Sequence, residues 1–310
     1  MTHTQNQPKT LLEAITFYSN NANCVEHIKK HYWPGGEVCC VRCGSLAISE
    51  KKNRPQFRCK DCKYDFSIRT NTIFENSPLP LSKWLAAFWL MGNTKNGISS
   101  HELGRSLGVT QKTAWFMSHR IRLAMQETSP KQLTEVVEAD ECYVGGSRKN
   151  WSNKKRAAVP FTYDHKTAVV ALVERDGKAI ANVIKDAQDE TIKAEVRKYV
   201  APEAVLFTDD ARAYKSLGHE FWHMSVNHSQ KEYGRGMVST NTVEGFFSLL
   251  KRSIKGTHIH VTPYHLDRYL DDQTFRYNER KSNDAGRFDV MTAQSIGRRL
   301  TWKQLTGKVV

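Results

Sequence analysis

Four cysteines in two closely spaced pairs constrain the fold of this chain more than any other feature. Two residues lie inside each pair, Cys40 with Cys43 and Cys59 with Cys62, and 15 residues separate the pairs. Two such turns facing each other supply the four tetrahedral sulfur ligands that a structural Zn²⁺ ion prefers. The spacing predicts a zinc ribbon over residues 34–70, because Zn²⁺ would replace much of the apolar core that so short a segment cannot form.

The remaining cysteines do not suggest a disulfide framework. The chain has seven cysteines in total, and an odd number without a recognisable secretion signal argues against paired disulfides. Cys39 directly precedes Cys40, so the ligand register could slip by one residue, although the two-residue spacing favours Cys40. Cys24 and Cys142 are expected to be small buried apolar side chains.

Charge and hydropathy predict a cytoplasmic protein that binds nucleic acid. The first residues, MTHTQNQPKT, contain no charged region followed by an apolar one, and no apolar run approaches the roughly 18 residues of a membrane span. The formal net charge is +14. A surplus of this size favours a polyanionic partner, because Lys and Arg displace counterions from phosphates. We therefore expect a cytoplasmic protein with a nucleic-acid partner.

Residues 98–122 have the pattern of two helices around a tight turn at Gly108. Ser99 or Ser100 would cap the first helix and Thr110 the second. This is the pattern of a helix-turn-helix, whose second helix enters the major groove of DNA. An ordinary helical hairpin with a solvated polar face is the alternative. The side chains expected to contact DNA are Gln111, Lys112, Thr113, Arg120 and Arg122.

Acidic residues occur at unusual places in two predicted strands. The segment 135–144 has the apolar pattern of a strand and ends at a Gly-Gly turn, yet it contains Asp140 as a candidate metal ligand. A solvated acidic edge strand is the alternative. A second apolar run ends in Asp209 and Asp210, where active-site carboxylates lie in open α/β sheets. An N-cap role is the alternative there and suits Asp210 better.

A third acidic residue, Glu244, lies in a predicted helix that Thr240 could cap. Lys251 follows seven residues later, so the two charges share one face of the helix. Two carboxylates from strands and one from a helix can hold two Mg²⁺ or Mn²⁺ ions about 3.5–4 Å apart for in-line attack on phosphorus. Taken alone, this helix would be interpreted as an ordinary solvated charged face.

The motifs together resemble the IS1595-type (ISXO2-like) transposases of bacterial insertion sequences, from about Trp33 to Asn278. The order of zinc ribbon, helix-turn-helix and acidic strand ending in Gly-Gly is that of the family. The segments that carry the resemblance are WPGGEVCCVRCG, FRCKDCKYDFSIRTNTIF, KTAWFMSHRIR, EADECYVGG, TDDARAY, STNTVEGFFSLLKR and RYLDDQTFRYNER.

The resemblance implies a ribonuclease H-like fold with a DDE-type triad that cleaves DNA at terminal inverted repeats and transfers the 3′ ends into target DNA. Carried onto the matching positions, the acids are Asp140, Asp209 and Glu244, with Lys251 as their basic partner. Double-stranded DNA is the implied partner. Because transposition brings two DNA ends together, we expect at least a dimer on DNA.

Two site assignments stay open within the resemblance. The family commonly has Gly after its second Asp, whereas this chain has Asp210, so Asp210 is a rival to Asp209. Some relatives have Asn as the third member, so Asn241 is a rival to Glu244. We prefer Glu244, because its seven-residue spacing to Lys251 suits one helical face.

Further basic residues follow the acidic strand in the segment 148–156 and are expected to grip DNA, with a solvated loop as the alternative. The residues assigned to DNA contact outside the helical pair are Lys149, Lys154, Lys155, Arg156 and Arg252. His228 could touch substrate, although a structural role suits it better.

The expected organisation is an α/β chain in which a helical segment (1–33), the zinc ribbon (34–70) and a helix-turn-helix region (71–130) precede a ribonuclease H-like domain (131–310). Two other functions remain possible from the residues alone. A zinc-ribbon regulator would bind DNA specifically without cutting it. A related nuclease would cut DNA without joining it.

Overall fold

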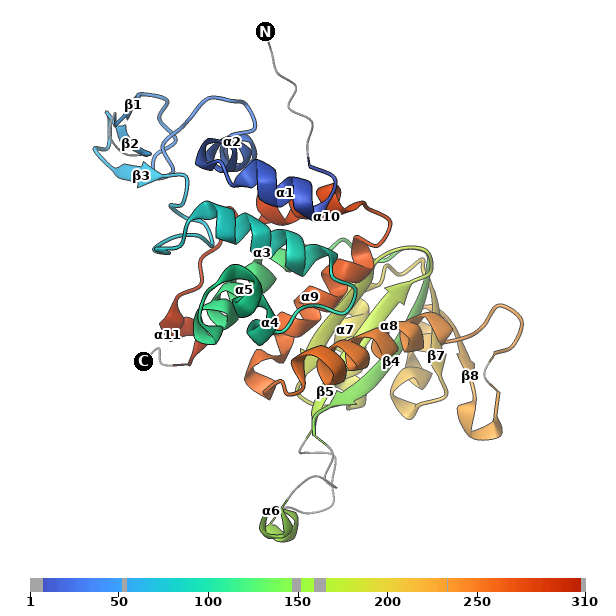
Figure 1. Ribbon diagram of the computed structural model, residues 1–310. Coiled ribbons are helices and arrows are strands. Elements are labelled where there is room, and N and C mark those ends of the chain that lie inside the picture. Colours follow the sequence, from blue (N-terminus) through green and yellow to red (C-terminus); the bar gives the residue numbers. More distant parts are fainter. Residues whose placement is uncertain (1–7, 52–54, 147–151, 159–165, 233, 308–310) are drawn as a thin grey trace. The chain divides into compact units, whose positions relative to one another are not determined.

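The computed structural model describes residues 8–307 apart from 52–54, 147–151, 159–165 and 233 (Figure 1). The chain divides into two compact units. The first comprises Met1–Gln126 together with Lys281–Val310, and the second comprises Glu127–Arg280. No helix in the described part of the chain is long and apolar enough to span a membrane.

The first unit contains a small antiparallel sheet and a group of helices. Its strands are β1 (Ile48–Glu50), β2 (Gln56–Cys59) and β3 (Asp65–Ser67), in the order β1-β2-β3. Its helices are α1 (Leu11–Tyr18), α2 (Asn21–Tyr32), α3 (Leu81–Asn93), α4 (Ser100–Leu107), α5 (Gln111–Met125), α10 (Asp284–Gln294) and α11 (Trp302–Leu305).

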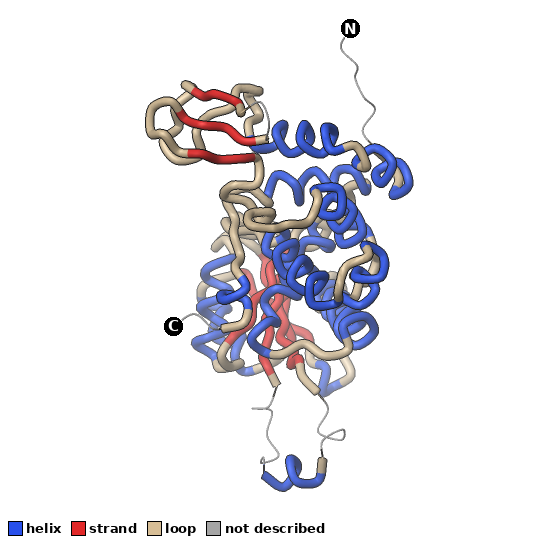
Figure 2. The backbone as a smooth tube through the Cα atoms, turned by 60° about the vertical axis from the view of Figure 1, so that its left-hand side comes forward, coloured by secondary structure: helices blue, strands red, loops and turns tan. Residues whose placement is uncertain are grey.

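The three short strands form a module with little apolar core of its own. A short loop joins β2 to β3 and is drawn tan beside the red strands in Figure 2. Phe57 and Phe66 face each other across β2 and β3, and both pack near Trp33, whose ring centroid lies 5.8 Å from that of Phe57. These three buried aromatic residues are the main apolar contribution, so another interaction must hold the loops in place.

The helices of the first unit pack around α3, which is apolar on most of its surface. Phe288 of α10 lies 5.3 Å from Trp89 of α3, measured between ring centroids. A Cβ atom at Gly92 of α3 would lie 2.8 Å from the Met291 sulfur of α10, so the Met291 side chain would have to shift. The expected catalytic domain at 131–310 therefore ends too late: residues 281–310 belong to the first unit, because the buried side chains of α10 complete its core.

The expected pair of helices around a tight turn is present as α4 and α5. Gly108 ends α4 in the left-handed conformation, with φ of +60°, which favours glycine. Ser99 Oγ accepts the backbone N–H of Glu102, and Thr110 Oγ1 accepts that of Thr113. The predicted turn and both caps are thereby confirmed, with Ser99 rather than Ser100 as the first cap.

The second unit is built on a five-stranded mixed sheet in the order β6-β5-β4-β7-β8. β4, β5 and β6 are antiparallel neighbours, whereas β4, β7 and β8 run parallel. The strands are β4 (Val136–Val144), β5 (Thr167–Glu174), β6 (Ala179–Ile184), β7 (Val205–Asp209) and β8 (Trp222–Val226). The helices are α6 (Asn153–Ala158), α7 (Asp189–Tyr199), η3 (Arg212–His219), η4 (His228–Gln230), α8 (Asn241–Arg252), η5 (Ser253–His258), η6 (Pro263–His265) and α9 (Leu266–Asn278).

Helices cover both faces of this sheet. One face packs against α7 and η3 through a core that includes Val137 and Ala139. The opposite face packs against α8 and α9 through a core that includes Cys142. Figure 1 shows α8 crossing β4 and β5 on that face. Because side chains alternate along a strand, Glu138 and Asp140 face the α8 side with Cys142.

Candidate functional site

The four predicted cysteines lie together at the tips of two loops in the first unit. Their sulfur atoms are all within 4.8 Å of one another. Cys40 Sγ is 3.6 Å from Cys62 Sγ, and Cys43 Sγ is 3.6 Å from Cys59 Sγ. Two sulfurs bound to one tetrahedral Zn²⁺ at about 2.3 Å are about 3.8 Å apart, so the donor set fits zinc. The cluster contains Cys40 and not Cys39, which confirms the preferred ligand register.

Two of the three predicted carboxylates come from neighbouring parallel strands. Asp140 lies in the middle of β4, and Asp209 is the last residue of β7. The parallel register pairs Glu138 with Phe207, and two further residues along each strand bring Asp140 opposite Asp209. Both side chains therefore lie on the face of the sheet that α8 covers.

Glu244 adds a third carboxylate from the first turn of α8. Burial, together with the charges of Glu141, Asp209 and Glu244, raises the pKa of Asp140 to about 7. Among the described residues the ligand oxygens of these three carboxylates do not all fall within 4.8 Å of one another, but Asp140 and Asp209 lie opposite each other on neighbouring strands and Glu244 lies in the first turn of the helix that covers them. The structure thus brings Asp140, Asp209 and Glu244 into one cluster.

Asp209 and Asp210 differ in what they face. Asp209 Oδ1 accepts the backbone N–H of Ala211 at 3.0 Å, while its charge acts on Asp140. Asp210 is exposed, accepts a hydrogen bond from the Asn227 side chain at 3.2 Å and lies 3.6 Å from Lys215 Nζ. The alternative of Asp210 as an N-cap is wrong, because the residue that caps η3 is Ala211, with no side-chain hydrogen bond.

The surroundings of Glu244 also differ from those of its rival, Asn241. Glu244 Oε1 accepts a hydrogen bond from Thr240 Oγ1 at 3.2 Å and lies 3.5 Å from His228 Nε2. Asn241 is the first residue of α8, and it is exposed, as Glu244 is. The expected cap is wrong in its detail, because the Thr240 hydroxyl bonds to Glu244 and makes no cap hydrogen bond to the backbone N–H groups of α8.

Lys251 lies two helical turns beyond Glu244, as the sequence spacing requires. Its positive charge lowers the pKa of the Cys142 thiol, although burial dominates and raises that pKa to about 12. Cys142 is two residues beyond Asp140 on the same face of β4, so Lys251 lies on the carboxylate side of the sheet.

Glu138 and Arg175 form an ion pair on the carboxylate side of the sheet, and no local sequence pattern predicts it. Glu138 has no exposed surface and accepts the backbone N–H groups of Thr242 at 2.6 Å and Val243 at 3.0 Å, at the start of α8. Arg175 donates to Glu138 Oε1 at 2.7 Å and to the backbone oxygen of Met237 at 2.7 Å. Glu138 therefore caps α8 and fixes the end of the helix that carries Glu244.

Glu141 is a further carboxylate near the cluster, but it lies on the opposite face of β4. Tyr214, which is fully buried, donates to Glu141 Oε2 at 2.7 Å. Burial raises the pKa of Glu141, and Asp209 raises it further, whereas the Tyr214 hydrogen bond lowers it. The negative charge of Glu141 thus acts on Asp140 from the opposite face of β4.

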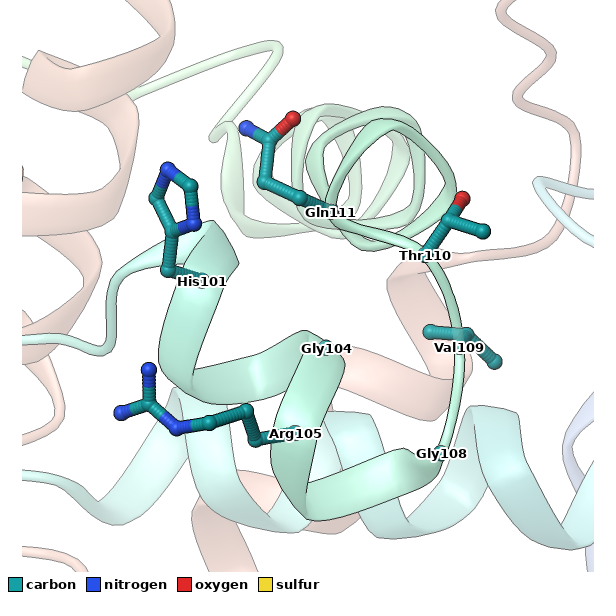
Figure 3. A pocket seen from close by; sticks show the side chains of 7 residues that line it. All are labelled: His101, Gly104, Arg105, Gly108, Val109, Thr110 and Gln111. Atoms are coloured by element: carbon teal, nitrogen blue, oxygen red, sulfur yellow. The ribbon is translucent and has the colours of Figure 1, made fainter.

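The elbow between α4 and α5 forms a pocket on the first unit (Figure 3). Gln111 Nε2 donates to Ser100 Oγ at 2.9 Å, and Lys112 Nζ lies 4.9 Å from the centre of the Trp302 ring. Both side chains stay exposed, and Thr113 is half-buried. The residues that line the pocket are His101, Gly104, Arg105, Gly108, Val109, Thr110 and Gln111.

Two residues assigned to DNA contact are buried instead. Arg120 is 4% exposed, donates to the backbone oxygen of Glu75 at 2.5 Å and lies 5.0 Å from the centre of the Phe116 ring. Arg122 is 2% exposed. The prediction was wrong for both, because a helix that packs into a core buries even charged positions on its inner face.

The other basic positions are only partly described. Lys149 lies outside the described residues. Lys154 and Arg156 are exposed on α6, and Lys155 belongs to the same helix, but its side chain lies outside the described part. Arg252 is exposed at the end of α8, next to Lys251.

Two family models and two relatives match this chain. Residues 132–278 match the ISXO2-like transposase domain, and residues 19–65 match the transposase zinc-ribbon domain. A Halobacterium salinarum protein, described as an uncharacterized protein in transposable element ISH50, is 29% identical over 276 residues, covering 82% of this chain and 90% of that protein. An uncharacterized transposase-like protein of Haemophilus influenzae is 26% identical over 102 residues, covering 33% and 81% respectively. The resemblance seen in the sequence is confirmed: the chain matches the family models of the ISXO2-like transposase domain and of the transposase zinc ribbon, and it has a relative in a transposable element.

Proposed function

We propose that this protein is a DDE-type DNA transposase that cleaves at the terminal inverted repeats of an insertion sequence and joins the 3′ ends to target DNA. The observation that carries the proposal is the cluster of Asp140, Asp209 and Glu244 on one face of the mixed sheet. The family match over 132–278 supports the same function.

The second unit is proposed to have a ribonuclease H-like fold. Three antiparallel strands continue into two parallel ones, and helices cover both faces. In this arrangement the first strand of the sheet, β4, lies at its centre. The central strand carries Asp140, and its parallel neighbour ends in Asp209, so the topology alone places two carboxylates side by side.

The carboxylate cluster fits hard divalent cations such as Mg²⁺ or Mn²⁺. Its donors are oxygen atoms only, which these ions prefer. The raised pKa of Asp140 reflects burial and mutual repulsion, and bound cations would relieve that repulsion. Asp140, Asp209 and Glu244 would hold two such ions, which supply activation of water or a DNA 3′-hydroxyl and stabilise the leaving oxygen.

The residues around the cluster would orient the DNA and the third carboxylate. Lys251 lies on the carboxylate side of the sheet and would pair with a phosphate next to the reacting one. Glu138 and Arg175 fix the first turn of α8, so Glu244 stays on the side of Asp140. His228 lies beside Glu244 and would hold its carboxylate in position rather than contact the DNA.

The first unit is proposed to recognise the DNA ends. It combines the four-cysteine ribbon with the α4–α5 pair, whose exposed Gln111 and Lys112 would reach base edges or phosphates. The formal net charge of +14 supports a DNA partner. Because two ends must be joined in one reaction, we expect at least a dimer on DNA.

The deciding experiment combines the protein with a labelled duplex carrying the terminal repeat of its element and a supercoiled target plasmid, with Mg²⁺ or with EDTA. We expect metal-dependent nicking and joining that Asp140→Asn abolishes and the control Asp210→Asn retains. Cleavage without joined product would instead identify a nuclease. Specific binding without cleavage in any metal would identify a DNA-binding regulator.

A further inference from the structure

A second cluster of metal-ligating side chains lies in the helical part of the first unit, on α2 and α10 rather than on the loops that carry the four cysteines. His27 and His31 are four residues apart on α2 and therefore project from the same face of the helix. Asp289 faces them from α10, which packs against α2 in the same unit. One ligand atom from each of the three residues lies within 4.8 Å of the others.

The separations within this cluster suit a shared ion better than direct hydrogen bonds. Asp289 Oδ1 lies 3.6 Å from His31 Nε2 and 3.9 Å from His27 Nε2, and both distances exceed the usual hydrogen-bond range. Two ligands bound at about 2.0–2.1 Å to one tetrahedral Zn²⁺ are about 3.4 Å apart. Both separations from Asp289 are therefore within a few tenths of an ångström of the distance between two ligands of one ion.

His31 gives an independent reason to expect a ligand. Its Nε2 atom is shielded from solvent, and no hydrogen bond from the described part of the chain reaches it. Most buried polar atoms are satisfied, because leaving one unpaired costs about 1–3 kcal/mol. A cation between His31 and Asp289 would satisfy this nitrogen.

The surroundings keep His27 in the form that binds metal. Its ring stacks on Phe288 with centroids 4.9 Å apart, and Tyr18 contacts it edge-on. The His27 side chain is only 8% exposed, and burial disfavours the charged imidazolium. Metal binding requires the neutral imidazole.

Metal binding would replace a hydrogen bond between His27 and Thr292. The Thr292 hydroxyl donates to the backbone oxygen of Phe288 at 2.9 Å, so it must accept the 3.2 Å hydrogen bond from His27 Nε2. That bond requires the proton of the neutral ring on Nε2. Coordination through Nε2 would require the other neutral tautomer, with the proton on Nδ1, and the bond to Thr292 would break.

We infer that His27, His31 and Asp289 form a second structural metal site for a divalent transition ion, with Zn²⁺ as the best match. Two imidazoles and one carboxylate are a common zinc ligand set, and water would complete the tetrahedron. The ion would join α2, near the start of the chain, to α10, near its end. It would therefore stabilise the contact that closes the first unit.

Metal analysis of the full-length protein tests this inference. The protein is loaded with excess Zn²⁺ in the presence of millimolar Mg²⁺, which competes for the carboxylate cluster, and unbound metal is then removed by gel filtration. We expect two zinc equivalents per chain for the wild type and one for His31→Gln and Asp289→Asn. His101→Gln, which removes an exposed histidine from the same unit, should keep two.

Titration with Co²⁺ gives a readout that does not depend on how the variants fold. Co²⁺ bound by the four cysteines should give strong thiolate-to-cobalt charge-transfer bands. A second equivalent, bound by nitrogen and oxygen atoms, should add only weak visible bands. Saturation of the wild type at one equivalent, or equal zinc content in the wild type and Asp289→Asn, would overturn the inference.

Discussion

The four-cysteine cluster of the first unit and the three-carboxylate cluster of the second unit depend on their surroundings in opposite ways. The cysteines come from one short segment with three short strands and three buried aromatic residues as its main apolar contribution. The carboxylates come from two central strands and a helix with a large apolar core on each face of the sheet. In the ribbon the ion would hold the fold together, whereas in the second unit the fold holds the ligands together against their repulsion.

The largest effect should come from removing one thiolate of the ribbon. We expect Cys59→Ser to release zinc and unfold the ribbon, because structural zinc contributes on the order of 10 kcal/mol to such modules. Zinc content and limited proteolysis within residues 40–65 would measure this, and binding to the terminal repeat should fall at least tenfold. The control Cys39→Ser should keep zinc, and a loss of zinc in that variant would refute the assigned register.

Removing one carboxylate should have the opposite effect on stability. Asp140→Asn should slow DNA cleavage at least 10³-fold, or about 4 kcal/mol, because a ligand for the catalytic ions is lost. Without divalent metal, however, the variant should unfold at a higher temperature than the wild type in calorimetry at pH 8. The wild type buries a repelled negative charge under these conditions, and the amide does not.

The raised pKa of Asp140 also predicts how the stability of the metal-free wild type depends on pH. The folded pKa of Asp140 is about 7, above its ordinary value of 3.8, so the folded state binds the proton more tightly than the unfolded state. Stability should therefore fall as pH rises from about 4 to about 7, by no more than about 4 kcal/mol from this residue. Mg²⁺ should restore it. A lower melting temperature for metal-free Asp140→Asn at pH 8 would break the contrast between the two clusters.

The two clusters also differ in how far the sequence predicts them. Spacing alone identifies the cysteines, because both pairs are local and their geometry hardly depends on the rest of the chain. Asp140 and Asp209 are predicted by their place in apolar strands, and their proximity follows from the parallel register. Glu244 needs the resemblance to the family, since its helix alone has the pattern of a solvated charged face.

The residues that the sequence did not predict correctly all depend on tertiary packing. Arg175 follows β5 and reaches Glu138 only because the sheet brings them together, so no local pattern marks the pair. Arg120 was assigned to DNA because it lies on the second helix of the α4–α5 pair, yet that part of α5 packs inward. α10 belongs to the first unit through contacts between distant parts of the chain. A prediction that divides the sequence into consecutive domains cannot include such contacts.

Variants of the Glu138–Arg175 pair test whether the fold keeps the three carboxylates in place. We expect Arg175→Met to destabilise the protein by about 3 kcal/mol, because Glu138 is left charged and buried. Cleavage should slow as the first turn of α8 loosens. Chemical denaturation should show a smaller loss for the double variant Glu138→Gln with Arg175→Met, in which no unpaired charge remains.

An exposed pair in the same unit provides the matched control. Arg197 and Glu220 form two hydrogen bonds of similar length, 2.8 and 2.7 Å, but their side chains are 48% and 39% exposed. Arg197→Met should therefore cost less than about 1 kcal/mol. Equal losses in Arg175→Met and Arg197→Met would show that the buried pair does not fix α8.

The smallest effect should separate DNA binding by the first unit from chemistry in the second. Lys112→Ala should weaken binding to the terminal repeat by about 1 kcal/mol and reduce the salt dependence of binding by about one phosphate contact. The single-turnover cleavage rate at saturating DNA should not change, because Lys112 lies in the other unit from the carboxylates. By contrast, Arg120→Ala should lower stability, since the buried guanidinium packs on Phe116. A slower saturated rate in Lys112→Ala would mean that end recognition and catalysis are coupled, and the division of roles between the two units would fail.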